Sequence, residues 1–210
     1  MKVDDSKYAT FVAAAHKVAQ YGLVQCSSGN LSWRVGSDEA MLSASGAWLA
    51  ELTAKQIALC ELSSGQCLND VKPTCEAGFH LGILKAHPDA NVVLHFQSPY
   101  ATALACGDPT KYNLNLTIEV PVYIGDAAVV EYLPPGSNEL AEAVANALTG
   151  SDTQMAILKN HGLVTLGKTF DDAIQKAIFF EQACQICLTN PDAKPLGPDA
   201  VAYLHELGKA

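Results

Sequence analysis

The spacing of apolar residues along the chain predicts a mixture of short helices and strands. Between Tyr8 and Ala19 apolar side chains recur at helical spacing, which predicts an amphipathic helix ending near Tyr21-Gly22. Compact apolar runs predict strands, whereas a proline or a capping pattern predicts a helix start. Strands are expected at 41–43, 57–62, 91–96, 120–124, 128–132, 155–159 and 163–166, and further helices from just after Pro73 to about Lys85 and at 100–106, 137–148 and 169–188.

These elements do not alternate strictly as strand, helix, strand. The expected fold is therefore α/β, a single domain over residues 1–210 with a central, largely antiparallel mixed sheet flanked by helices. The stretch Cys26 to Asn30 is too rich in Ser and Gly to be regular structure. After Leu188, three prolines (Pro191, Pro195 and Pro198) prevent a continuous helix.

Composition narrows the function classes. With 49% hydrophobic and 17% charged residues the chain is neither disordered nor a coiled coil, and its formal charge of −9 without a Lys/Arg cluster argues against nucleic acid or anionic membranes as partners. A phosphate group would have to be held by neutral donors, a helix N-terminus or a metal. No apolar run approaches ~18 residues, and an acidic start and seven scattered cysteines indicate the cytoplasm.

Three polar segments lie where expected elements begin or end. In Ser27-Ser28-Gly29-Asn30 the glycine lets the backbone approach an anion, although a surface turn is the simpler interpretation. Ser43-Ala44-Ser45-Gly46 is equally compatible with a phosphate nest and with an ordinary turn. Lys72-Pro73-Thr74-Cys75-Glu76 stands at a helix start that favours an anionic ligand, but Thr74 as a helix cap and Glu76 as a first-turn charge explain it more simply.

Two histidines complete the candidate chemistry. His95 closes an apolar strand, and His161 lies in the turn Asn160-His161-Gly162 between two strands. Each alone is more often a packed or solvated residue, but two histidines and a carboxylate at separate element ends are what a catalytic metal site needs. His80 follows Glu76 by four residues on one helix face, where it either orients Glu76 or plays a structural part.

Taken in order, these segments resemble the class II aldolase/adducin family, and in particular its L-fuculose-phosphate aldolase branch. The resemblance covers about Tyr8 to Leu188. Its motifs are Ser28-Gly29-Asn30-Leu31-Ser32, Ser43-Ala44-Ser45-Gly46, Pro73-Thr74-Cys75-Glu76, the run from His87 to His95, Ser98-Pro99-Tyr100-Ala101-Thr102, Pro134-Pro135-Gly136-Ser137 and Asn160-His161-Gly162.

The resemblance implies a site and a reaction. One divalent ion per subunit, zinc in most members, would be held by histidines and would stabilise an enediolate as a Lewis acid. Glu76 would bind the ion and act as acid/base. The implied metal ligands are Glu76, His95, Gln97 and His161, and the substrate phosphate would lie among Asn30, Ser45, Gly46, Thr74 and Cys75.

The chain departs from the family pattern at three places. The family has His-x-His where this chain has His95-Phe96-Gln97, so that an amide oxygen would face the ion in place of an imidazole. Zinc remains the expected ion, but its affinity should fall or the preference should move toward Mn, Co or Mg. Cys75 stands where the family commonly has Ser, and a thiol is a poor donor to phosphate. The tyrosine that this branch supplies near Thr117 to Ile124 has no aligned counterpart.

The sequence thus predicts a metal-dependent lyase that cleaves a ketose 1-phosphate to dihydroxyacetone phosphate and an aldehyde. Sugar-phosphate dehydratases, decarboxylases and epimerases of the family are alternatives, although the epimerases carry Asp at the position of Glu76. A non-catalytic, adducin-like assembly module is the alternative from another class, with Gln97 marking a decayed site. The resemblance also implies a homotetramer with active sites between subunits.

Overall fold

A seven-stranded sheet forms the centre of the molecule in the computed structural model, which describes residues 4–149 and 153–209. Neighbouring strands are antiparallel except β5 and β6, which are parallel. This confirms the largely antiparallel mixed sheet expected from the sequence. In spatial order the strands are β3 (Ile57–Glu61), β2 (Glu39–Ser43), β1 (Asn30–Arg34), β4 (Val92–Phe96), β7 (Gly162–Gly167), β6 (Met155–Leu158) and β5 (Ala127–Val130).

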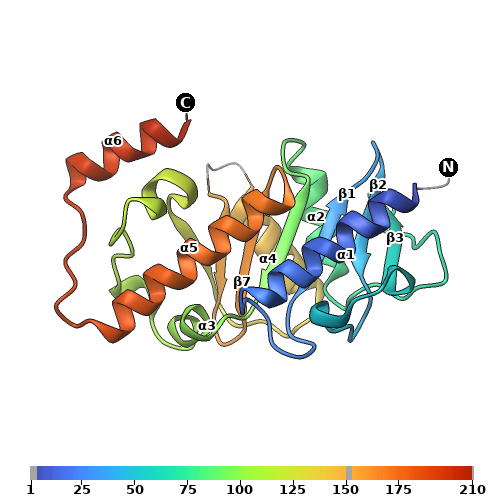
Figure 1. Cartoon of the computed structure of the whole chain (residues 1–210), viewed down its shortest axis with the longest axis horizontal. Coiled ribbons are helices and arrows are strands. Elements are labelled where there is room, and N and C mark those ends of the chain that lie inside the picture. The colour runs from blue at the N-terminus through green and yellow to red at the C-terminus, as the bar shows by residue number, and fades with distance from the viewer. Residues whose placement is uncertain (1–3, 150–152, 210) are drawn as a thin grey trace.

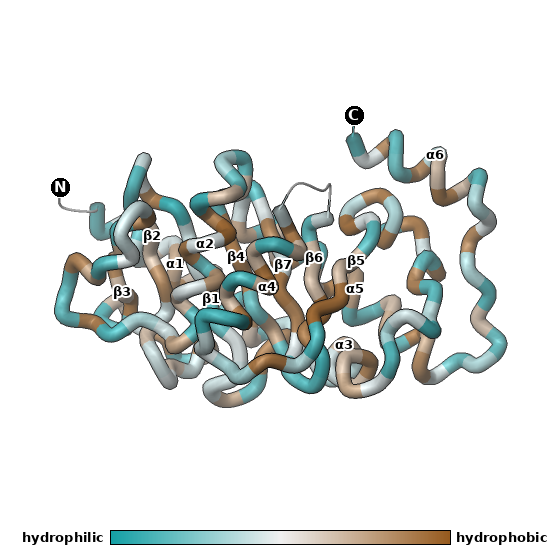
Figure 2. Tube along the Cα trace, turned by 180° about the vertical axis from the view of Figure 1, so that it is seen from behind, coloured by the Kyte–Doolittle hydropathy of each residue, from teal (hydrophilic) through white to brown (hydrophobic). Residues whose placement is uncertain are grey.

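Helices cover both faces of the sheet (Figure 1). On one face α1 (Asp5–Gln20), α3 (Pro99–Ala105) and α5 (Phe170–Thr189) enclose one apolar core, and on the other α2 (Ala77–Ala86) and α4 (Asn138–Leu148) enclose a second. Alternation along a strand divides its side chains between the two cores. In β4, Leu94 belongs to the first core and Val93 to the second, and the central strands are among the most hydrophobic parts of the trace (Figure 2).

Several helix starts follow the capping chemistry of the sequence. The Ser137 hydroxyl accepts a hydrogen bond from the Leu140 amide at the start of α4, and Thr169 accepts one from the Asp172 amide at the start of α5. These contacts satisfy amides that have no partner inside the helix. The short helical turns are η1 (Leu49–Glu51), η2 (Ala54–Gln56), η3 (Pro109–Lys111) and η4 (Val120–Ile124).

Three expectations about local structure were wrong. Residues 120–124 form the helical turn η4 rather than a strand, because Pro121 has no amide proton for a ladder and Gly125 closes the turn at φ +71° with a bond to the Val120 carbonyl. The polar Asn30, expected in an irregular stretch, begins β1, since its partner across the sheet is His95.

The third correction concerns a helix start. Helix α2 begins at Ala77 rather than just after Pro73. The Thr74 amide bonds the Ser43 carbonyl and the Ser45 amide bonds the Lys72 carbonyl, which holds this segment against the end of β2. The tail does not continue α5, as its prolines predict, but it forms a separate helix, α6 (Pro198–Lys209), packed against η4 (Figure 1). Pro198 is compatible with a helix start.

None of the helices within residues 4–149 and 153–209 is long and apolar enough to cross a membrane.

Candidate metal centre

Three elements meet at the candidate metal centre. The register of the sheet pairs Asn30 at the start of β1 with His95 near the end of β4. His161 lies in the turn between β6 and β7. Strand β7 pairs with β4, so that Val164 lies opposite His95. Glu76 is the residue immediately before α2, held there by the pairing of residues 72–74 with β2. Residues distant in sequence are therefore brought together by strand pairing.

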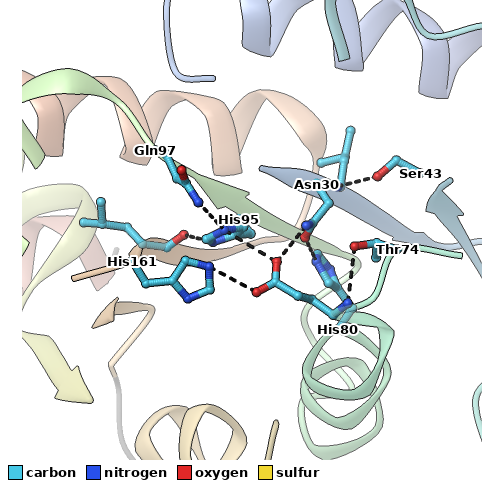
Figure 3. A network of polar contacts seen from close by, with 10 residues as sticks. Asn30, Ser43, Thr74, His80, His95, Gln97 and His161 are labelled. Atoms are coloured by element: carbon cyan, nitrogen blue, oxygen red, sulfur yellow. Dashed lines mark hydrogen bonds and ion pairs between the residues drawn. The ribbon is translucent and has the colours of Figure 1, made fainter. Parts of the chain in front are cut away.

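Glu76, His95 and His161 converge on one point. Figure 3 shows His95 and His161 side by side at this place, with Gln97 next to His95. One potential ligand atom from each lies within 4.8 Å of the others. Glu76 Oε2 is 3.5 Å from His95 Nε2, and Glu76 Oε1 is 3.3 Å from His161 Nε2. The Glu76 side chain is only 4% exposed. The convergence that the sequence alone could not establish is present in the fold.

The backbone fixes which nitrogen of His95 faces this point. His95 Nδ1 lies 2.9 Å from the Leu163 carbonyl oxygen, which only accepts hydrogen bonds, so Nδ1 carries the proton. In the neutral ring, the form that binds metal, the lone pair of Nε2 then faces Glu76. Burial and the nearby His95 lower the pKa of His161, an effect that the Glu76 charge partly opposes. Neutral imidazoles are the form that binds metal.

These residues fit a divalent cation. Glu76 Oε1 and His161 Nδ1 are buried atoms without a hydrogen-bond partner in the described part of the chain. An unpaired buried carboxylate oxygen is costly, and a cation would compensate its charge. Two imidazoles and one carboxylate also form a common protein ligand set for catalytic zinc, with a remaining position open to substrate.

Gln97 lies beside this ligand set, as the strand period predicts. Its amide nitrogen is 3.3 Å from His95 Nε2. An amide can turn over to present its oxygen at the same place, and the two orientations differ only in hydrogen bonding. Gln97 therefore lies within reach of an ion at this centre, and its coordination of such an ion stays a prediction.

A cavity of about 140 Å³ opens beside the three residues. Four of the five predicted phosphate residues line it, namely Asn30, Gly46, Thr74 and Cys75, whereas Ser45 does not. Thr74 does not cap α2; its hydroxyl accepts a hydrogen bond from the Glu76 amide. The described residues around the cavity are Ser27, Ser28, Gly29, Asn30, Ala44, Gly46, Ala47, Thr74, Cys75, Glu76, His95, Gln97, Pro135 and His161.

Behind the cavity a buried hydrogen-bond network contacts Glu76. Asn30 Nδ2 donates to Glu76 Oε2 at 2.8 Å, Asn30 Oδ1 contacts His80 Nε2, and His80 Nδ1 is 2.7 Å from Ser32 Oγ. The sequence suggested that His80 either orients Glu76 or is structural, and gave Ser32 no role. The spacing of the residues could have indicated this network, because Asn30 and Ser32 share a strand face and Glu76 and His80 share a helix face.

Two glycines allow the backbone segments to approach this closely. A Cβ atom on Gly162 would lie 2.7 Å from the Phe96 carbonyl oxygen and 2.7 Å from Gln97 Cγ. Gly29 has φ +79°, and a Cβ atom there would lie 2.7 Å from the His95 carbonyl oxygen. Both positions therefore require glycine for the turns to pack against the end of β4.

Comparison with known proteins agrees with this arrangement. Residues 9–188 match the family described as "Class II Aldolase and Adducin N-terminal domain". A 3-oxo-tetronate 4-phosphate decarboxylase from Haemophilus influenzae is 32% identical over 166 residues, which are 77% of each chain. An L-fuculose phosphate aldolase from Methanococcus maripaludis is 37% identical over 160 residues, covering 76% of this chain and 84% of the relative.

Solved structures show the same fold. The crystal structure of YgbL from Klebsiella pneumoniae, a putative aldolase/epimerase/decarboxylase, superposes with a TM-score of 0.87 at 26% identity, covering 97% of this chain and all (100%) of that one. An L-fuculose 1-phosphate aldolase also gives a TM-score of 0.87, at 22% identity, and covers 99% of this chain and 98% of its own.

Replacing Gln97 by histidine tests whether this side chain faces the ion. If it does, Gln97→His supplies a third imidazole, a stronger donor to zinc than a carboxamide, and zinc should bind about tenfold tighter, a gain of about 1.4 kcal/mol. Competition against a zinc-selective chelator measures this change. Gln182→His, which adds a histidine on the exposed side of α5, controls for adventitious binding. Equal zinc affinity of wild type and Gln97→His would exclude Gln97 as a ligand.

Proposed function

The chain belongs to the family of class II aldolase and adducin N-terminal domains and is an enzyme of the class II aldolase superfamily; from this premise we propose that it is a metal-dependent carbon–carbon lyase. Its proposed substrate is a small phosphorylated sugar, a ketose 1-phosphate that is cleaved to dihydroxyacetone phosphate and an aldehyde. The observation that carries the proposal is the convergence of Glu76, His95 and His161 beside a cavity.

The proposed roles follow from the position of each group. A divalent ion held by Glu76, His95 and His161, with Gln97 beside it, would supply Lewis-acid stabilisation of negative charge on the substrate's oxygens. When the carbon–carbon bond breaks, the aldehyde leaves and the other fragment remains as an enediolate. Glu76, at the wall of the cavity, would take up a proton from solvent and give it to the enediolate carbon, which completes dihydroxyacetone phosphate.

Neutral groups would hold the substrate phosphate. Asn30, Gly46, Thr74 and Cys75 line the cavity, and Ser45 lies next to it in sequence. Among the described residues that line the cavity, none is Lys or Arg. This composition supports the sequence-based proposal that the phosphate is bound by backbone amides and neutral side chains, in a chain whose net charge is −9.

Decarboxylation of a phosphorylated 3-oxo acid is the second candidate, and one observation favours it. Aldol cleavage must remove a proton from the substrate hydroxyl that becomes the aldehyde, whereas loss of carbon dioxide needs no such base. No tyrosine is among the described residues that line the cavity. The similarity to 3-oxo-tetronate 4-phosphate decarboxylases supports this candidate as well. Both reactions would leave the same enediolate for Glu76 to protonate.

A panel of substrates distinguishes the two candidates. The metal-supplemented protein is given ketose 1-phosphates in one series and 3-oxo acid phosphates in another, and dihydroxyacetone phosphate is measured in both with an NADH-coupled reductase. Aldehyde release identifies an aldolase, and carbon dioxide release identifies a decarboxylase. Absence of product from both series, with bound metal verified, would contradict the proposed lyase function.

The Glu76 carboxylate is expected to be essential for turnover. Glu76→Gln keeps the size of the side chain but removes the proton carrier, so kcat should fall by roughly 10²–10⁴-fold on whichever substrate is active. A thermal melt beside the steady-state kinetics verifies folding. Glu139→Gln, an exposed carboxylate at the start of α4, is the matched control. Near-normal turnover of a folded Glu76→Gln protein would reduce Glu76 to a structural charge.

We further propose that the chain assembles as a homotetramer with active sites between subunits. Exposed apolar side chains are consistent with such contacts: Ile118 is 57% exposed, Tyr203 69% and Leu207 55%, and α6 has no buried residue in the isolated chain. Multi-angle light scattering at micromolar concentration should give a mass about four times that of the chain. A clean monomer would contradict this assembly and any site that needs a second subunit.

A further inference from the structure

Three hydrogen bonds behind Glu76 join a strand to a helix. Asn30 and Ser32 are two residues apart on β1, so their side chains point to the same face of the sheet. Glu76 and His80 are four residues apart along the start of α2, so they lie on one face of that helix. These two faces meet, and the order of contacts is Ser32, His80, Asn30, Glu76.

All four side chains are buried. Ser32 and His80 are each 0% exposed, Glu76 is 4% exposed and Asn30 is 8% exposed. Only Asn30 and Glu76 line the cavity; Ser32 and His80 lie behind them. Ser32 and His80 are therefore placed to act on the site through Asn30 rather than by touching a ligand.

The chemistry of the four groups fixes the direction of every hydrogen bond. The Glu76 carboxylate accepts from Asn30 Nδ2, so Asn30 Oδ1 is the atom that faces His80, and an amide oxygen only accepts. His80 Nε2 must then be the donor. Burial and the nearby His95 hold the pKa of His80 well below its usual range, so the ring carries one proton. Nδ1 is consequently an acceptor, and the Ser32 hydroxyl donates to it.

A chain of donors that all point toward Glu76 has two consequences. Each donor polarises the next, and buried networks of this kind orient a side chain more firmly than a single bond does. Because the Asn30 N–H group donates to Oε2, a proton on that oxygen would point toward another donor. Oε1 has no hydrogen-bond partner among the described residues and lies 3.3 Å from His161 Nε2.

We propose that Ser32, His80 and Asn30 form a positioning relay that holds Glu76 by Oε2 and leaves Oε1 as the oxygen that faces the cation. This inference deepens the proposed function and rests on it for the catalytic part. It assigns Ser32 and His80 as positioning residues, because neither lines the cavity. The geometry of the relay itself needs only the contacts of the folded chain.

Zinc affinity tests the relay without any need for activity. Removing a group that orients a metal ligand typically costs 10–100-fold in metal affinity, so Ser32→Ala should weaken zinc binding by about tenfold in chelator competition. Ser32→Cys keeps the volume but donates weakly, so its affinity should lie between those of wild type and Ser32→Ala. Thr165→Val removes an equally buried hydroxyl that bonds the Gln154 carbonyl on the opposite face of the sheet, and should leave zinc affinity unchanged.

A double-mutant cycle separates positioning from a general effect on the fold. If Ser32 acts through the Glu76 carboxylate, Ser32→Ala should change zinc affinity by less than about twofold in a Glu76→Gln background. An equal loss with and without the carboxylate would overturn the relay, as would unchanged affinity in folded Ser32→Ala.

Turnover supplies the second readout once a substrate is known. Ser32→Ala should lower kcat by about tenfold with KM within about twofold of wild type, because the displaced group acts on the chemical step and not on substrate binding. A raised KM with unchanged kcat would contradict the catalytic part of the relay. If no lyase substrate is found, the zinc cycle still decides the positioning, so failure of the proposed function and failure of the relay are distinguishable.

Discussion

A buried carboxylate is the constraint on which the site depends. Glu76 is 4% exposed, and an ionised group withdrawn from water must be compensated by donors or by a cation. Within the described residues the carboxylate side chain accepts one hydrogen bond, from Asn30, and two imidazoles lie within 3.5 Å. Imidazoles in the neutral form that binds metal do not balance a full negative charge. The arrangement is therefore better suited to a complex with a cation than to the protein alone.

The sheet places the residues that meet this constraint. Antiparallel pairing sets His95 beside Asn30 on one side and beside Val164 on the other, so the end of β4 lies between β1 and the β6–β7 turn. The segment before α2 is held to the end of β2 by backbone hydrogen bonds. Each candidate ligand thus rests on regular structure or on a turn anchored to it. Rigid supports of this kind hold ligands close to one geometry.

Local patterns predicted most of the elements because their causes are local. The caps at Ser137 and Thr169 and the apolar run at β4 are read from neighbouring residues. Two of the failures have causes outside the segment. β1 begins at the polar Asn30 because His95 pairs with it, and α2 is delayed because residues 72–74 bond to β2. No pattern within either segment carries that information.

The same distinction applies to the site. The residues alone raised the possibility of a metal site of two histidines and a carboxylate, but each of them has a simpler interpretation. Resemblance to a family was needed to name Glu76, His95 and His161 as ligands. Their convergence is a property of strand pairing and of two close approaches that Gly29 and Gly162 permit. Ser32 was not anticipated because a serine in a strand carries no signal of its own. The contact of Ser32 with His80 can be recognised only when β1 and α2 are known to face each other.

The cavity indicates what one chain contributes to catalysis and what it leaves to others. Its described lining holds a carboxylate, imidazoles and neutral polar groups, but neither Lys nor Arg for a phosphate, nor a tyrosine for a leaving hydroxyl. A small anionic substrate would meet a chain of net charge −9 there. Binding must then depend on backbone amides, on a cation, or on groups from a second subunit. The leaving group then depends on whether a second subunit supplies a base, because release of an aldehyde needs one and release of carbon dioxide does not.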